Sequence, residues 1–405
     1  MLTPAEATDL VLRSIAVLPP ETISLGRAAG RVLRQEVHGE RDQPPFHRVT
    51  MDGIAFASSP DPVHGTIPRK FPILGVQAAG APPLALTQPA GCIEVMTGAV
   101  LPTGCDCVIP IEKLTITAGV AEVASTITPS PWMNVQKQGW DGRAGQPLLS
   151  PGVRLDATHV AVLASAGLAA VQVTRLPRIL VVTTGDELVE PGLPIQAWQI
   201  RRSNAYAVLA ALQKAGFADV DNAHLDDEPN SMLAKLQIYL DSYDVLILSG
   251  GVSMGRFDYV PETLSALGVR KGFHKISQRP GLPMWFGTRN DGKAAHALPG
   301  NPVSTIVCLL RYVLPGLHAA LGLPPAAPME LALGEDFEVK PPLTYFLPVT
   351  LANGGEHAVS GAVALPKATK GSGDFISLLG TQGFVELPPG PNKYPKGFVT
   401  RLHRW

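Results

Sequence analysis

The sequence predicts a multidomain protein of mixed α/β and β structure, whose middle domain holds a mostly parallel, doubly wound sheet. The chain has 405 residues, and at about 150 residues per domain this length favours several domains. Short apolar runs alternate with helical segments over residues 177–326, which is typical of parallel strands joined by helices. Residues 28–150 and 327–405 instead carry short Val/Ile runs between proline and glycine turns, which favours β-rich domains on either side.

Charge and hydropathy exclude two classes of partner. The net charge is −1 and the isoelectric point is about 6.8, whereas nucleic-acid-binding domains are usually clearly basic. No apolar run reaches the roughly 20 residues that a membrane-spanning helix needs, and the closest, at 159–174, is predicted to be a buried helix of small residues. Four cysteines are too few for a disulfide framework, and Cys105 and Cys107 lack a second pair at zinc spacing. We therefore expect a cytoplasmic protein without nucleic-acid or membrane partners.

The N-terminal segment predicts an amphipathic helix. Thr3 and Glu6 have the spacing of a capping box, Pro4 occupies the first helical position, and the pattern extends to Val17. Residues 151–176 are also predicted to be helical. We expect them to pack with the N-terminal helix, which would make this helical domain discontinuous in sequence.

Apolar runs and their flanking caps predict the elements of the middle domain in turn. We predict strands at 179–182, 219–225, 245–248 and 273–276, and helices from 203 or 204 to about 216 and at 229–240, 258–267 and 302–321. In such sheets ligands bind beyond the carboxyl ends of the strands, near a switch in strand order. In the last region, Asn353-Gly354-Gly355 predicts a turn.

Three acidic or glycine-rich loops follow consecutive predicted strands: Thr183–Glu187, Asp226–Asp227 and Ser249–Ser253. Because the carboxyl ends of parallel strands meet at one edge, we expect these loops to face one crevice. Gly250 and Gly251 permit positive φ and a close backbone approach, and their N–H groups can bind an anion. The alternative is that each loop is only a well-formed turn.

Carboxylates and cations are concentrated around this expected crevice: Asp186, Glu187, Asp226, Asp227 and Asp258, with Lys275 and Arg279. Acidic groups beside a phosphate-binding loop usually share a divalent cation, and oxygen-only ligands favour Mg²⁺. The alternative is a solvated acidic rim. Further along, Pro299, Gly300 and Asn301 precede a predicted helix start, where Ser304 can meet an oxyanion.

Common catalytic motifs do not fit this loop. No Gly-Lys-Ser/Thr follows the glycines, as a Walker A loop requires, and the Gly-x-Gly-x-x-Gly dinucleotide pattern is also missing. Ser253 lacks a Gly-x-Ser-x-Gly context, which argues against a serine hydrolase.

A series of motifs extends over essentially the whole chain: "PPFHRVTMDGIA" (44–55), "MTGAVLPTGCDCVIP" (96–110), "GWDGRAGQPLL" (139–149), "TTGDEL" (183–188), "SGGVSMGRFDY" (249–259), "RPGLP" (279–283), "LPGNPVS" (298–304) and "KGSGDFISLLGTQGFVELP" (370–388). In this order the motifs resemble those of the molybdopterin molybdenumtransferases, the MoeA and gephyrin E-domain family.

The resemblance implies a fold and an activity. It implies insertion of molybdenum from molybdate into adenylylated molybdopterin, with AMP release and a Mg²⁺ cofactor. It further implies a homodimer whose cleft is shared between subunits, with transient contacts to other enzymes of the molybdenum cofactor. The implied domains are a helical linker (1–43 and 141–176), a β-rich lobe (44–140), a three-layer α/β molybdopterin-binding domain (177–326) and a C-terminal β-barrel (327–405).

Roles for individual residues follow from the same resemblance. Catalytic roles are implied for Asp52, Thr97, Asp141, Glu187, Lys275 and Arg279. Cofactor-binding roles are implied for Gly185, Asp186, Ser249, Gly250, Gly251, Ser253, Pro299, Gly300, Asn301, Ser304 and Ser372. Metal-binding roles are implied for Asp258 and for Asp227 or its neighbour Asp226.

Two departures from the family pattern concern the oxyanion site. Leu282 stands where the family usually has a lysine, and Gln136 stands where it often has an arginine. The departure at Leu282 leaves a non-catalytic molybdopterin-binding scaffold open. The adenylylation of molybdopterin also remains open, because the family that performs it shares the architecture of residues 177–326. Molybdate and tungstate are not distinguished by the sequence.

Overall fold

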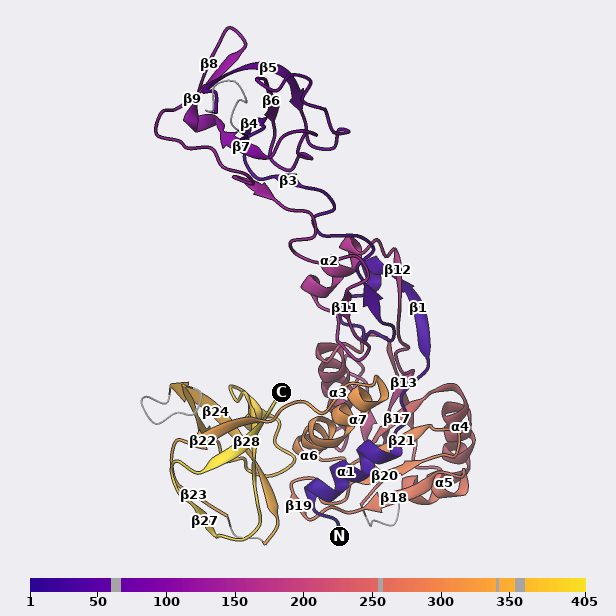
Figure 1. Cartoon of the computed structure of the whole chain (residues 1–405). Helices are drawn as coiled ribbons and strands as arrows, with labels where there is room; N and C mark the ends of the chain where they lie inside the picture. The colour runs from indigo at the N-terminus through magenta and orange to yellow at the C-terminus, as the bar shows by residue number, and fades with distance from the viewer. Residues whose placement is uncertain (60–66, 254–257, 340–341, 354–360) are drawn as a thin grey trace.

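The computed structural model describes residues 1–59, 67–253, 258–339, 342–353 and 361–405, and Figure 1 shows an extended molecule. A β lobe (residues 44–140) lies at one end and a slender linker (residues 18–43 and 141–176) connects it to an α/β body (residues 177–321). A C-terminal barrel (residues 327–405) lies beside the body. Separate clusters of buried apolar side chains fill the lobe, the linker, the body and the barrel. The exact domain boundaries remain a prediction.

The body contains the expected sheet, with strand order β16-β13-β17-β21-β20-β18. The parallel strands are β13 (Ile179–Thr184), β16 (Val220–Leu225), β17 (Val245–Ser249) and β21 (Ala294–Leu298). Two antiparallel strands complete it, β20 (Trp285–Thr288) and β18 (Arg270–His274). The mostly parallel sheet is therefore confirmed, but the strand predicted at 273–276 is wrong in its bounds. Lys275 has a φ of 74°, which takes the chain out of the extended conformation.

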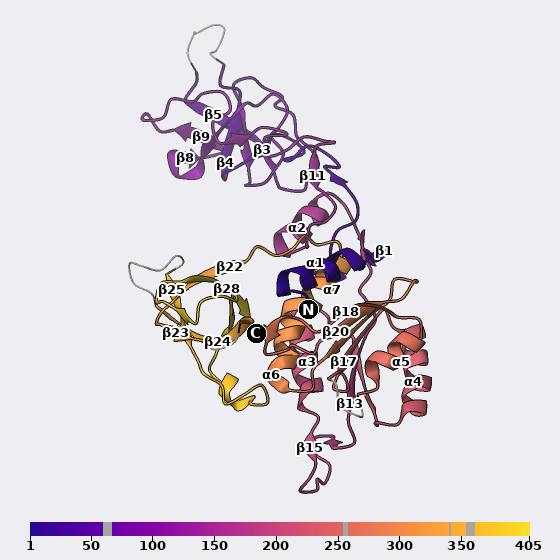
Figure 2. The same ribbon diagram turned by 90° about the horizontal axis from the view of Figure 1, so that it is seen from below.

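Helices cover both faces of this sheet and make three layers (Figure 2). One face carries α3 (Ser203–Lys214) and α6 (Pro302–Cys308), and the other carries α4 (Pro229–Ser242) and α5 (Val260–Ala266). Successive strand residues alternate between the two cores: Val181 and Ile247 face α3, whereas Val182 and Leu248 face α4. This alternation explains why the strands read as continuous apolar runs.

The helix predicted at 302–321 is interrupted. A π-helical turn (Leu309–Val313) separates α6 from α7 (Leu314–Ala320), and Pro315 lies in the first turn of α7. Proline lacks the N–H that would continue the regular ladder, which accounts for the wider turn. The stretch Pro302–Ala320 is long and apolar enough to cross a membrane by composition, but most of it is buried inside the body as a core helix.

The N-terminal helix α1 (Pro4–Ser14) has the predicted capping box at Thr3, but it packs into the core of the body and not into the linker core that Leu155, Leu163 and Val171 help to form. Its Ala7 and Val11 belong to the core of the body. A Cβ at Gly316 would lie 3.0 Å from Val11, so the glycine of α7 permits this close approach. The partner was missed because the two segments are about 300 residues apart in sequence.

The prediction of one buried helix over residues 159–174 is wrong. Helix α2 (Ala157–Ser165) ends at Ser165, and the later residues form β12 (Ala170–Thr174), which pairs with β1 (Pro20–Ser24). Burial alternates along the start of β12, which is the period of a strand rather than of a helix. The linker also contains the pair β2 (Val37–His38) and β11 (Pro147–Leu149).

The lobe is built on a mixed sheet with strand order β7-β4-β6-β5-β9-β8. Its strands are β4 (Gly53–Phe56), β5 (Lys70–Gln77), β6 (Cys92–Val95), β7 (Cys107–Pro110), β8 (Leu114–Thr117) and β9 (Val120–Val123). A short pair, β3 (Arg48–Val49) and β10 (Val135–Gln136), lies where the lobe meets the linker. All four cysteines of the chain are free and buried, as expected of structural residues.

The C-terminal region closes into a barrel because β24 pairs with both β25 and β26. The barrel strands are β22 (Met329–Leu333), β24 (Thr344–Asn353), β25 (Ala362–Pro366), β26 (Gly383–Leu387) and β28 (Val399–Arg404), with the side pair β23 (Phe337–Glu338) and β27 (Lys393–Tyr394). Strand β19 (Gln278–Arg279) leaves the body and pairs with β24, which ties the two together. The turn predicted at Asn353-Gly354-Gly355 extends outside the described residues.

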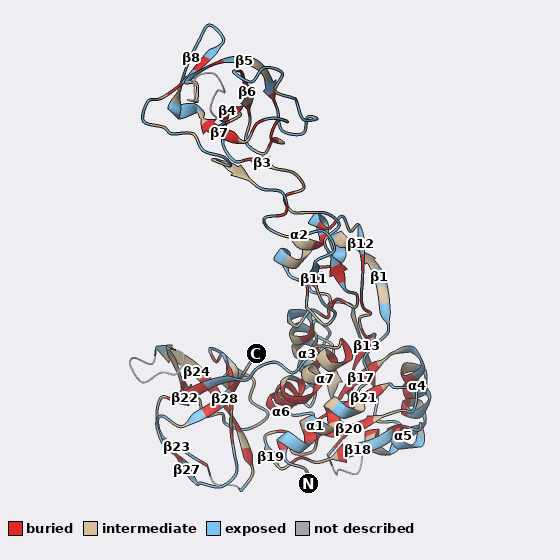
Figure 3. Ribbon diagram, viewed as in Figure 1, coloured by how far each residue is buried: buried red, intermediate tan, exposed pale blue. Residues whose placement is uncertain are grey.

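Figure 3 shows buried residues concentrated in the strands and in α6.

Candidate functional site

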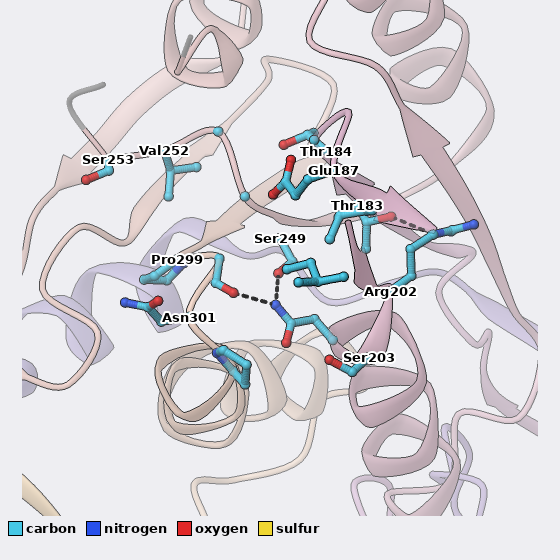
Figure 4. Close-up of a pocket in the computed structure, with 18 of the residues that line it drawn as sticks. Thr183, Thr184, Glu187, Arg202, Ser203, Ser249, Val252, Ser253, Pro299 and Asn301 are labelled. Atoms are coloured by element: carbon cyan, nitrogen blue, oxygen red, sulfur yellow. Dashed lines mark hydrogen bonds between the residues drawn. The ribbon is translucent and has the colours of Figure 1, made fainter. Parts of the chain in front are cut away.

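A cleft of about 570 Å³, here called the acidic cleft, opens at the carboxyl edge of the body sheet (Figure 4). The loops after β13, β16, β17 and β21 form it, as the parallel topology predicts. It gathers eleven of the residues predicted for the site: Gly185, Glu187, Asp227, Ser249, Gly250, Gly251, Ser253, Asp258, Pro299, Gly300 and Asn301.

The two glycines after β17 are required by the backbone. Gly250 and Gly251 have φ angles of 104° and 65°, in the region that side chains rarely adopt. A Cβ on Gly250 would lie 2.8 Å from the Thr184 carbonyl oxygen, and one on Gly251 would lie 2.8 Å from Val260. The loops after β13 and β17 therefore approach each other as closely as backbone permits, and they form one wall of the cleft.

Acidic side chains crowd another part of the cleft. Burial, followed by the charges of Asp186, Glu187, Asp258 and Asp226, raises the pKa of Asp227 to about 6. The Oδ1 atom of Asp227 is buried and has no hydrogen-bond partner among the described residues. Asp227 lines the cleft, whereas Asp226 does not, and this geometry favours Asp227 as the ligand of a cation.

The donor set fits a hard cation that also binds the substrate. Among the residues that the structure describes, no three His, Cys, Asp or Glu side chains converge to hold a metal by themselves. Glu187, Asp227 and Asp258 nevertheless line the same cleft. Mg²⁺ is commonly held by one or two carboxylates together with phosphate oxygens and water, so a complete protein cage is not needed.

A further wall of the cleft is polar, with Asn204 and Arg202 as its side chains, and sequence reasoning missed it. The Nδ2 atom of Asn204 donates to Ser249 Oγ at 2.9 Å and to the Gly300 carbonyl at 2.8 Å. Its Oδ1 atom is buried, and no described residue donates to it. Arg202 donates to Thr183 Oγ1 at 3.1 Å and pairs with Glu190 at 2.6 Å. The sequence predicts only that a helix begins at 203 or 204, because nothing in the local sequence indicates that the start of α3 faces the crevice.

A second cavity, of about 370 Å³, lies between the body and the barrel and is here called the interdomain cavity. It brings together Arg279, Ser304 and Ser372 from the predicted set and adds Lys370. Asn301 Nδ2 donates to Ser372 Oγ at 2.9 Å and so connects the cavity to the rim of the acidic cleft. Leu282 also lines this cavity, so the position of the missing lysine is indeed at its wall.

Two predicted residues lie outside both cavities as the described residues define them. Asp186 accepts a hydrogen bond from the Asp227 amide at 3.0 Å and so joins the loop after β13 to the loop after β16. Lys275 adopts a positive φ, and its amide donates to the Met284 carbonyl at 2.9 Å.

The three remaining predicted residues are in or next to the lobe. The amide and hydroxyl of Thr97 donate to Asp52 Oδ1 at 2.6 and 2.7 Å, and the two bonds lower the pKa of Asp52. Gln136 Nε2 lies 2.9 Å from both oxygens of Asp141, while Arg48 donates to Gln136 Oε1. In Figure 1 the lobe is at the far end of the chain from the body, so one chain does not bring these residues to the acidic cleft.

Comparisons with known proteins match both the N-terminal half of the chain and the body that holds the acidic cleft. A family model described as the MoeA N-terminal region (domain I and II) matches residues 2–167, and one described as a probable molybdopterin binding domain matches residues 180–319. A molybdopterin molybdenumtransferase from Synechocystis sp. is 38% identical over 100% of both chains. Molybdopterin molybdenumtransferase 2 from Mycobacterium tuberculosis is 33% identical over 79% of this chain and 80% of its own.

A solved structure extends the likeness to three dimensions. The molybdopterin biosynthesis MoeA protein from Pyrococcus horikosii aligns with a TM-score of 0.82 and 27% identity, over 100% of this chain and 99% of that one. The similarity therefore includes the lobe, the linker, the body and the barrel together.

Proposed function

The chain belongs to the family of molybdopterin molybdenumtransferases, and we propose that it inserts molybdenum into adenylylated molybdopterin and releases AMP. One observation carries the proposal: the acidic cleft is lined both by Asp227, whose buried Oδ1 atom has no partner among the described residues, and by Gly250 and Gly251, whose loop suits a phosphate. A phosphoanhydride with a bridging cation would satisfy both features.

The glycine loop would bind the phosphate groups of the substrate. Gly250 and Gly251 carry no side chain over the backbone, so a phosphate can approach the amides of this loop directly. Asn204, with its unpartnered Oδ1, can accept a hydrogen bond from a donor on the same ligand. These groups orient the substrate along the sheet edge.

Glu187, Asp227 and Asp258 would hold Mg²⁺ together with the substrate phosphates. When bound, the ion would act as a Lewis acid on the phosphoanhydride. It would also favour the ionised form of Asp227, whose pKa is raised to about 6 by burial and then by the neighbouring carboxylates. The repulsion among these carboxylates is unfavourable, and a bound cation would reduce it. A scaffold has no need for such a cluster, so its presence supports an enzyme.

Molybdate is the second substrate, and the interdomain cavity is its proposed site. Arg279 and Lys370 supply positive charge, and Ser304 and Ser372 supply hydroxyl donors. The guanidinium group of Arg279 can bind two oxygens of a tetrahedral oxyanion at once. The hydrogen bond between Asn301 and Ser372 places this cavity next to the rim of the acidic cleft.

We further propose a symmetric homodimer in which the lobe of one chain reaches the acidic cleft of the other. Asp52, Thr97 and Asp141 would then complete the site from the partner. A closed twofold arrangement gives two equivalent sites, each built from both chains.

The decisive assay supplies adenylylated molybdopterin, molybdate and Mg²⁺, and follows AMP release together with reconstitution of an apo-enzyme. AMP release that depends on both molybdate and Mg²⁺ is expected. A folded protein that binds molybdopterin without turnover would be a scaffold, and one that consumes ATP and free molybdopterin would be an adenylyltransferase. Either result would overturn the proposal.

A further inference from the structure

The lobe contains a third cavity, of about 520 Å³, here called the Trp cavity. Trp132 and Trp140 line it together with Gln136 and Lys137. It is formed by β10 and by residues beside the short strand pair β3–β10 rather than by the central sheet of the lobe. None of its lining residues belongs to the acidic cleft or to the interdomain cavity.

The backbone around this cavity is held in an unusual conformation. Trp132 and Asn134 have φ angles of 67° and 54°, and a left-handed conformation is a clear outlier for a bulky residue such as tryptophan. The surroundings hold Trp132 in place: its amide donates to the Asp106 carbonyl at 2.6 Å, and its ring lies 4.8 Å from the His47 ring. Residues with such strained backbone angles persist where the surrounding structure holds them in place, and they are concentrated at ligand sites.

Trp140 presents a large aromatic surface to solvent. The residue is 73% exposed, and within the described part of the chain its indole stacks on no other ring. Its backbone is nevertheless fixed, because its amide donates to the Lys137 carbonyl at 3.1 Å and the next amide donates to the Gln43 carbonyl at 2.8 Å. An exposed indole on a fixed turn is a ready surface for stacking a planar ring.

The cavity adjoins charged groups already assigned to the site. Gln136, one of its walls, donates to Asp141, the residue that follows Trp140. The ammonium group of Lys137 lies 4.6 Å from the centre of the Trp132 ring and adds a positive charge at the same edge. Aromatic surface, a cation and hydrogen-bonding groups together suit a planar heterocycle that carries a phosphate.

We propose that the Trp cavity binds the planar nitrogen heterocycle of the substrate, with Trp140 as the stacking surface and Trp132 as the wall. This inference rests on the proposed function, since the substrate would be held by its phosphates in the acidic cleft of the partner chain. The heterocycle is either the purine of the adenylyl group or the pterin, and both offer the flat, polarisable face that stacking requires.

The test measures the affinity of the intact protein for three probes: AMP, 6-carboxypterin and inorganic pyrophosphate. Trp140→Ala should raise the Kd of the stacked probe roughly 5- to 150-fold, which corresponds to about 1–3 kcal/mol for one stacked base. Trp140→Phe should recover most of the affinity, and pyrophosphate binding should not change. Trp198→Ala is the matched control, because Trp198 is equally exposed on the body but lines none of the three cavities.

The probes also separate the possible outcomes. Weaker binding of AMP alone identifies the purine, and weaker binding of the pterin alone identifies the pterin. If Trp140→Ala leaves both heterocycles unaffected, the proposal is wrong. If it weakens only the association of subunits, measured by sedimentation, Trp140 is a protein contact and the proposal is equally wrong. Because these are binding measurements, they remain informative even if the protein lacks transferase activity.

Discussion

Arg311 and Glu386 form a buried ion pair, with Nε and Oε2 at 3.0 Å, that joins the π-helical turn of the body to β26 of the barrel. Only 6% and 18% of their side-chain surfaces are exposed. Burial by itself raises the pKa of Glu386, but bonds from His403 and Arg311 outweigh it and lower the pKa to about 2. Since the interdomain cavity lies between body and barrel, this pair helps to fix its shape.

Glu386→Gln should therefore destabilise the protein by about 3 kcal/mol at pH 7, because it leaves Arg311 buried without its counter-charge. The depressed pKa means that the ionised pair stabilises the fold above about pH 4.5 and loses this effect as the pH falls toward 2. Urea unfolding of both proteins across this range should show the difference shrinking with acid. Asp336→Asn, which removes an exposed barrel pair with Lys393, is the control and should change little. A constant difference at all pH values would exclude the ion pair as its cause.

Asp227→Asn should have opposite effects on stability and on metal binding. The raised pKa means that ionisation of Asp227 disfavours the folded state, so wild-type stability should fall as the pH rises from about 4 to about 6. The variant should lack this fall and gain about 1 kcal/mol at pH 7, allowing for screening by solvent. Mg²⁺ should raise the melting temperature of the wild type but not of the variant.

The matched control for Asp227 is its neighbour. Asp226→Asn changes the same charge one residue away, outside the lining of the acidic cleft. It should keep the response to Mg²⁺. Equal responses of the two variants would mean that the cation, if bound, is attracted by overall charge rather than held by Asp227.

The glycine loop and the acidic loops were predictable because each depends on a few neighbouring residues. Gly250 and Gly251 mark a turn that only glycine tolerates, and the strand before them is a plain apolar run. Strand β21 was missed because Ala294-Ala-His-Ala-Leu298 has little intrinsic preference for a strand, and its pairing with β17 imposes that conformation. The roles of Asn204 and Arg202 were missed for a similar reason, since only the tertiary fold turns the start of α3 toward the cleft.

A shared site predicts that two inactive variants complement each other. Asp141→Asn would disable the lobe contribution, and Asp258→Asn would disable the acidic cleft. After random exchange of equal amounts, about half of the dimers should be heterodimers, and each heterodimer should have one intact site of its two. The mixture should therefore recover about a quarter of wild-type AMP release. Sedimentation should give about twice the 42.8 kDa mass of the chain.

The control for complementation mixes two lobe variants, Asp52→Asn and Asp141→Asn. Every shared site in such a mixture contains a defective lobe, so activity should not recover. Recovery in this control, or an active monomer, would contradict the shared cleft.

Leu282 should limit the affinity for molybdate. It lines the interdomain cavity with Arg279 and Lys370, at the position where the family pattern places a lysine. A hydrogen bond from a charged group contributes about 1.5–3 kcal/mol, which corresponds to roughly tenfold to a hundredfold in affinity. Leu282→Lys should therefore lower the molybdate concentration for half-maximal insertion by about tenfold or more, while the affinity for adenylylated molybdopterin, bound in the acidic cleft, should stay nearly constant.

Leu282→Gln separates charge from polarity in this comparison, because glutamine is polar and of similar length but uncharged. It should produce little of the gain if the charge is responsible. An unchanged molybdate dependence in Leu282→Lys would mean that Arg279 and Lys370 already neutralise the oxyanion. Weaker binding of both substrates, with a lower melting temperature, would instead show that Leu282 packs the wall between body and barrel, and that its correspondence to the family lysine is positional only.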